Sequence, residues 1–144
     1  MSSDRGVSTV VGYVITLGIT TVLISGLLIA AGGAVDDRQD ATSRDALDVI
    51  GQRIASNLMA ADRLAETDPG TTVVDVRLPS RIAGSGYRVT VNGSASELVL
   101  ESNRADATVH VPFVTGTDVT DTEVVGGDLR IVLTAADELE VRRA

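Results

Sequence analysis

A long run without charged residues lies between Arg5 and Asp36, close to the start of the chain. From Val7 to Val35 it is 29 residues long. The hydrocarbon core of a bilayer needs about 20 apolar helical residues, whereas the core of a secretory signal has only roughly 7 to 15. The rest of the chain has too few large apolar side chains to surround such a helix on all sides. The run therefore predicts a transmembrane helix over residues 7–35.

An ordinary cleaved signal peptide is the alternative interpretation of this run. Such a signal places several positive charges before a short apolar core, and here Arg5 is the one basic residue before the run. The stretch LLIAAGGAV at its end contains the small residues that a signal peptidase requires. Cleavage there would make the remainder a secreted accessory domain, and this alternative stays open.

Composition excludes several classes of function. The chain has no cysteine, which removes disulfides, thiol catalysis and cysteine-type zinc sites. It has 20 acidic and 12 basic residues, all of the latter arginine, and a net charge of −8. An acidic surface opposes nucleic-acid binding. The acidic, lysine-free composition also resembles that of proteins from extreme halophiles, whose dense carboxylates keep the surface hydrated.

After the apolar run, residues 36–68 change to an amphipathic helical pattern that Asp68-Pro69-Gly70 is expected to end. Gly32 and Gly33 are expected to form a weak joint between the two halves of one long helix. Apolar residues three and four apart form one stripe, which we call the apolar stripe: Leu47, Ile50, Ile54, Leu58, Ala61 and Ala65. Charged residues flank it and are expected on the solvent side: Asp45, Asp48, Arg53, Asp62 and Arg63.

Residues 69–144 are typical of short antiparallel strands. Seven segments are rich in Val and Leu and several alternate apolar with polar residues: TVVDVRL, YRVTV, SELVLES, ATVHVPF, TEVV, LRIVL and ELEVR. NGSAS, with Asn92-Gly93 supplying positive φ, and TAAD predict two hairpin loops. The expected fold is α+β, in which a long N-terminal helix packs its apolar stripe on a small antiparallel sheet in the manner of a lollipop.

The residues before the apolar run resemble a known processing signal. Arg5-Gly6 followed by VSTVVG looks like the class III signal peptide of archaeal type IV pilins and archaellins, most similar to small pilin-like proteins of haloarchaea. The resemblance implies that a prepilin peptidase cleaves between Gly6 and Val7 and that the apolar helix is retained. It also implies a cytoplasmic leader, residues 1–6, with Arg5 at the cytoplasmic face, and an extracellular domain, residues 69–144.

Two positions depart from the pilin patterns. Ser8-Thr9-Val10 stands where many archaeal pilins have Ser-Pro-Val, and Val11 stands where bacterial type IV pilins have Glu. Despite these departures, the resemblance implies a membrane-anchored, pilin-like structural subunit of the archaeal cell surface. Whether it polymerises stays open, and the alternative is a single-span surface protein whose β domain binds a partner.

Small residues recur four apart in two groups in the apolar run and would permit close approach of helices from other pilin-like subunits. They are Gly12, Thr16, Thr20, Gly26 and Ala30, which we call the small-residue positions. A purely lipid-facing role is the alternative, since Gly and Thr are common in single transmembrane helices. Membrane lipid, the prepilin peptidase and other subunits are the expected partners.

Asn92-Gly93-Ser94 is an acceptor sequence for N-glycosylation in a predicted hairpin loop, although turn chemistry alone also explains Asn-Gly. The single histidine, His110, alternates with Val109 and Val111 and is expected on the solvent side of a strand. Asp36, Asp37 and Asp40 are expected to be solvated helix residues rather than a calcium site. We expect no catalytic site, metal or cofactor.

Overall fold

The computed structural model describes residues 3–67, 72–104 and 106–144, with side chains described from Val7 onward. The chain divides into two compact units, Met1–Arg38 and Gln39–Ala144. The first element is one long helix, α1 (Ser3–Thr67), and the elements after it in the described ranges are strands. The expected α+β class is therefore confirmed.

Helix α1 is continuous through Gly32 and Gly33, so the helix has no break at the expected joint. Proline is absent between Ser3 and Thr67, and the backbone hydrogen bonds of the helix can therefore run without interruption. The helix ends at Thr67, and the expected stop signal at Asp68-Pro69-Gly70 lies outside the described residues.

Seven strands follow the helix, and each falls within or overlaps one of the segments predicted from the sequence. They are β1 (Val73–Val76), β2 (Tyr87–Asn92), β3 (Glu97–Ser102), β4 (Thr108–Pro112), β5 (Thr122–Val125), β6 (Leu129–Leu133) and β7 (Leu139–Arg143). Every pairing between these strands is antiparallel. The prediction of an antiparallel β region is confirmed.

The strands form two sheets, and the expectation of a single sheet was wrong. One sheet has the order β1-β6-β7 and the other β4-β3-β2-β5, with β5 and β7 in contact where the sheets meet. The chain changes sheet twice, between β1 and β2 and again between β5 and β6, the second time at Gly126 and Gly127. Gly127 has a φ of 129°, a conformation that residues with a Cβ rarely adopt, and the chain turns there into the other sheet.

Both predicted hairpin loops are present. The β2–β3 pair is closed by Gly93–Ser96, and the β6–β7 pair is closed by a loop in which the Thr134 N–H donates to the Glu138 carbonyl at 2.8 Å. The residue with positive φ in the first loop is Ser96, at 52°, which corrects the assignment of that role to Asn92-Gly93.

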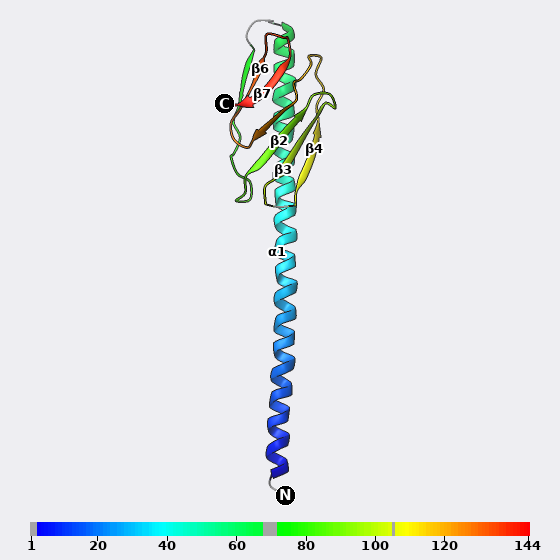
Figure 1. The fold of residues 1–144 in the computed structure, drawn as a ribbon, viewed down its shortest axis with the longest axis vertical. Coiled ribbons are helices and arrows are strands. Elements are labelled where there is room, and N and C mark those ends of the chain that lie inside the picture. Colours follow the sequence, from blue (N-terminus) through cyan, green and yellow to red (C-terminus); the bar gives the residue numbers. More distant parts are fainter. Residues whose placement is uncertain (1–2, 68–71, 105) are drawn as a thin grey trace. The chain divides into compact units, whose positions relative to one another are not determined.

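The core of unit Gln39–Ala144 forms between α1 and both sheets. All six residues of the apolar stripe are buried, which confirms the prediction from their spacing. Figure 1 shows the strands gathered around this part of α1. Alternate strand residues meet the helix in one hydrophobic cluster, including Val89, Val91, Leu98, Leu100, Val111, Leu129, Ile131, Leu139 and Val141. The helix is therefore the central core element of this unit.

Candidate functional site

The first half of α1 carries large apolar side chains that nothing covers. We call residues 7–35 the apolar segment. Its exposed large residues are Val7, Val10, Val11, Tyr13, Val14, Ile15, Leu17, Ile19, Val22, Leu23, Ile24, Leu27, Leu28, Ile29 and Val35. They occupy all sides of the helix, whereas a helix on the surface of a soluble domain is apolar on one side only. Among the described residues there is thus one helix that is long and apolar enough to cross a membrane.

Threonines of the apolar segment form hydrogen bonds within the helix itself. The Thr16 hydroxyl donates to the Gly12 carbonyl at 2.9 Å, and the Thr20 hydroxyl donates to the Thr16 carbonyl at 2.8 Å. A hydroxyl that finds its acceptor one turn away needs no water and no partner helix. These polar groups are therefore compatible with hydrocarbon surroundings.

The small-residue positions lie on one side of the helix. At about 100° per residue, all five fall within an arc of about 120°. Around Gly12 and Gly26, nothing lies within 4 Å of the place where a Cβ would stand. Small side chains on one face permit the backbones of two helices to approach closely.

The expected processing site lies at the beginning of α1. Arg5 and Gly6 are helical, and their side chains lie outside the described part of the structure. Val7, the expected first residue after cleavage, is 62% exposed. The residue after the expected bond is thus uncovered in the single chain.

The second half of α1 contains one charged residue whose solvent exposure was predicted wrongly from the sequence. Asp62 was expected on the solvent side, yet it is buried and contacts the segment after β4. Its carboxylate accepts hydrogen bonds from the backbone N–H groups of Gly116 and Thr117, both at 2.9 Å. Burial raises the pKa of Asp62, but these bonds and one from the Thr117 side chain outweigh it, so the pKa lies below its usual value.

The carboxylate of Asp62 therefore holds residues 116 and 117 against α1 through hydrogen bonds. Two backbone donors in a connecting segment would otherwise lack acceptors in a partly buried place. The helical pattern could not identify Asp62 as buried, because such a pattern records only the polarity and spacing of neighbouring residues. The group that binds Asp62 is 54 residues away along the chain. The other flanking charges, Asp45, Asp48, Arg53 and Arg63, are exposed as expected.

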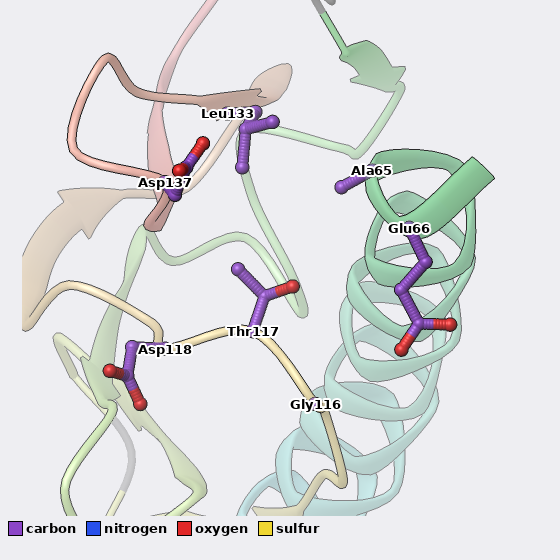
Figure 2. A pocket seen from close by; sticks show the side chains of 7 residues that line it. All are labelled: Ala65, Glu66, Gly116, Thr117, Asp118, Leu133 and Asp137. Carbon is purple, nitrogen blue, oxygen red and sulfur yellow. The ribbon is translucent and has the colours of Figure 1, made fainter. Parts of the chain in front are cut away.

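A surface hollow of about 370 Å³ lies beside this contact (Figure 2). Figure 2 shows Glu66 on the helix and Asp118 and Asp137 on the opposite side, with Thr117 between them. Within the described residues, no group of three or more acidic, histidine or cysteine side chains could hold a metal ion. The polar side chains that line the hollow are thus the carboxyl groups of Glu66, Asp118 and Asp137 and the hydroxyl of Thr117.

The remaining residues singled out from the sequence lie apart from one another. His110 is exposed on β4 and its Nδ1 lies 2.9 Å from Glu97 Oε1, which confirms its expected place on the solvent side. Asp36 and Asp37 are exposed on α1 and Asp40 is half-buried. Asn92 ends β2, at the start of the hairpin loop. Nothing brings these residues together into one site.

Comparison with known proteins identifies a family. Neither the comparison with curated proteins nor that with solved structures found a match. A family model described as a family of unknown function matches residues 2–143, nearly the whole chain, including the helix and all seven strands. The chain therefore belongs to the family of unknown function DUF7266.

Proposed function

We propose that this protein is a membrane-anchored, pilin-like structural subunit of the archaeal cell surface. The observation that carries the proposal is the contrast within α1. One half of the helix is apolar on all sides and uncovered, and the other half is the buried centre of a β domain. Such a helix both anchors the chain and carries the domain, which is the arrangement that a pilin-like subunit needs.

The proposed mechanism is assembly rather than turnover. A prepilin peptidase cuts between Gly6 and Val7, the apolar segment remains in the lipid, and it then leaves the lipid to pack against the same segment of other subunits. The small-residue positions lie on one face and leave room for a neighbouring backbone. The N-terminus lies in the cytoplasm and unit Gln39–Ala144 outside the cell, where its acidic surface suits high salt.

The mature N-terminus tests entry into the pilin pathway. We would purify the protein from membranes of cells with and without prepilin peptidase and determine its intact mass and N-terminal peptide. We expect a peptide that begins at Val7 and disappears when the peptidase is absent. A chain that begins at Met1 or Ser2 would contradict the pilin pathway, and one that begins near Ala34 would indicate an ordinary cleaved signal.

The second candidate is a single-span surface protein that never polymerises. The hydrogen bonds of Thr16 and Thr20 within their own helix favour it, because these two hydroxyls then need no acceptor on a second helix. In this case the β domain binds a partner at the cell surface while the helix serves only as an anchor.

A pair of matched variants distinguishes the two candidates. Gly26→Leu fills the face of the small-residue positions, whereas Gly18→Leu adds the same side chain about 140° away from the middle of that face. Both glycines have open space around them, so both variants should insert normally. We expect Gly26→Leu to reduce crosslinked oligomers in membranes far more than Gly18→Leu. Equal oligomer yields for both variants and the wild type would favour the non-polymerising candidate.

A further inference from the structure

The loop between β2 and β3 presents its acceptor sequence openly. Asn92 is half-buried at the end of β2, and Ser94, Ala95 and Ser96 are exposed. The Ser96 N–H donates to the Gly93 carbonyl at 3.1 Å and closes a tight turn. An enzyme that approaches the tip of this hairpin therefore meets the Asn92-Gly93-Ser94 sequence.

The hydrogen bonds of Asn92 involve one end of its carboxamide. Asn92 Oδ1 accepts from the Ser94 hydroxyl at 2.8 Å and from the Ala95 N–H at 3.0 Å. In the described part of the chain, Asn92 Nδ2 donates no hydrogen bond. The nitrogen that a glycosyltransferase uses is thus available, and the serine hydroxyl that completes the acceptor sequence is already beside the carboxamide.

Neighbouring segments hold the loop in this form. The Gly93 N–H donates to Asp121 Oδ1 at 2.7 Å. A Cβ on Gly93 would lie 1.7 Å from the Val119 carbonyl oxygen, so this position accepts only glycine. The acceptor sequence therefore has a defined conformation in the folded domain.

Ser94 is the member of the triplet that the turn does not require. The turn needs Gly93 for space, and the Ala95 N–H already satisfies Asn92 Oδ1. The Ser94 side chain is exposed and donates only to Asn92 Oδ1. The loop therefore requires Gly93, whereas the Ser94 hydroxyl adds a second hydrogen bond to an oxygen that the Ala95 N–H already contacts.

Two surface hollows flank the triplet and leave room for a sugar. Asn92 lines one of about 290 Å³, together with Thr90 and Thr122. Gly93 and Ser94 line the other, of about 430 Å³. The sugar attached to Asn92 would therefore lie against the domain surface without displacing core residues.

We propose that Asn92 carries an N-linked glycan, an inference that rests on the extracellular placement of the domain in the proposed function. The donor is a saccharide linked through phosphate to a membrane lipid. The bond between the anomeric carbon and the phosphate oxygen breaks, and that oxygen keeps the electron pair. Asn92 Nδ2 forms the new bond to the anomeric carbon and loses one proton to a base of the transferase.

Two substitutions at Ser94 test the proposal with little effect on the loop. Ser94→Ala destroys the acceptor sequence but leaves the bond from Ala95 to Asn92, whereas Ser94→Thr keeps the acceptor sequence. We would measure intact mass and the peptide that contains Asn92 for the protein purified from membranes of its native cells. We expect a covalent sugar mass in the wild type and in Ser94→Thr, and its complete loss in Ser94→Ala. An unmodified Asn92 in the wild type would overturn the proposal.

The side of the membrane on which unit Gln39–Ala144 lies is measured in the same cells. Because the chain has no cysteine, Val114→Cys gives a single thiol at a residue that is 79% exposed. If a membrane-impermeant maleimide labels it in intact cells and Asn92 is bare, glycosylation is refuted and the proposed function is untouched. If it is labelled only after lysis, the extracellular placement fails and both proposals are overturned.

Discussion

The two halves of α1 use similar residues in opposite ways. Leu27, in the apolar segment, is 70% exposed, whereas Leu58, in the apolar stripe, is fully buried. Both lie in one continuous helix, α1. The difference lies in the distribution of apolar residues around the helix. A single stripe has a β domain as its partner, and an all-round apolar surface needs lipid or other helices.

Polar groups and glycines differ between the halves in the same way. Thr16 bonds to the backbone of its own helix, whereas Asp62 bonds to a segment after β4. Gly33 has open space beside it, whereas a Cβ on Gly51 would lie 2.6 Å from Val111 Cγ2. Thr16 and Gly33 therefore need no contact beyond their own helix, whereas Asp62 and Gly51 lie against the β domain.

The largest expected effect tests this contrast with one substitution at two places. Leu58→Ala should lower the free energy of unfolding of the β domain by about 2–5 kcal/mol, because it removes buried contacts and leaves a cavity. Leu27→Ala, the matched control, should change it by less than about 0.5 kcal/mol. Urea unfolding of the full-length chain in detergent, followed by near-ultraviolet circular dichroism of buried Tyr87, measures both. Equal losses would mean that the two halves stabilise the domain alike.

A smaller loss is expected when the contact of Asp62 is removed. Asp62→Ala leaves the N–H groups of Gly116 and Thr117 without their acceptor and should cost about 2–3 kcal/mol in the free energy of unfolding. Asp62→Asn keeps one acceptor oxygen and should cost less. Exposed Asp48→Ala, on the same helix, serves as the control. If Asp62→Ala and Asp48→Ala cost the same, the contact does not stabilise the domain.

The pH dependence of this contact has a definite sign. The pKa of folded Asp62 is lowered, because hydrogen bonds from Gly116 and Thr117 outweigh the effect of burial. The ionised carboxylate therefore contributes its full stability above the usual aspartate pKa of about 3.9, and this is lost as the pH falls through the lower folded-state pKa. The stability difference between wild type and Asp62→Asn should be constant near neutral pH and shrink in acid. A difference that grows in acid would contradict the lowered pKa.

Much of the fold followed from periodicity. The spacing of three and four residues identified the buried face of α1, and alternation identified the strands, because burial of one face imposes these periods. The hairpins followed from short polar loops between such strands. These features depend on neighbours in the sequence, and local patterns are sufficient for them.

Features that depend on distant segments could not be predicted. The division into two sheets depends on where the chain changes sheet, after β1 and again after β5 at Gly126 and Gly127, which a strand pattern does not record. Gly93 was assigned to the hairpin for its backbone freedom, yet it is required because Val119 lies against it. The apolar segment was recognisable as a potential span, whereas its helix partners depend on other chains.

The smallest expected effect comes from replacing glycine by alanine, which should destabilise the second half of α1 and stabilise the first half. Gly51→Ala should gain about 1 kcal/mol of helix propensity but crowd Val111 and Leu100, whose stiff or packed side chains must move. Crowding of a packed core typically costs about 1–3 kcal/mol, so a net loss of about 1 kcal/mol is expected in the free energy of unfolding. Hydrogen exchange of the helix amides near each substitution measures the change locally.

Gly33→Ala meets no neighbour within 4 Å, so only the gain in helix propensity remains. Amide exchange around residue 33 should therefore slow by up to about fivefold, which corresponds to about 1 kcal/mol, in protein solubilised in detergent. Faster exchange would mean that the added methyl group is crowded, and hence that a second helix lies against this glycine. The same substitution thus reports whether the apolar segment is surrounded by lipid-like solvent or by another copy of itself.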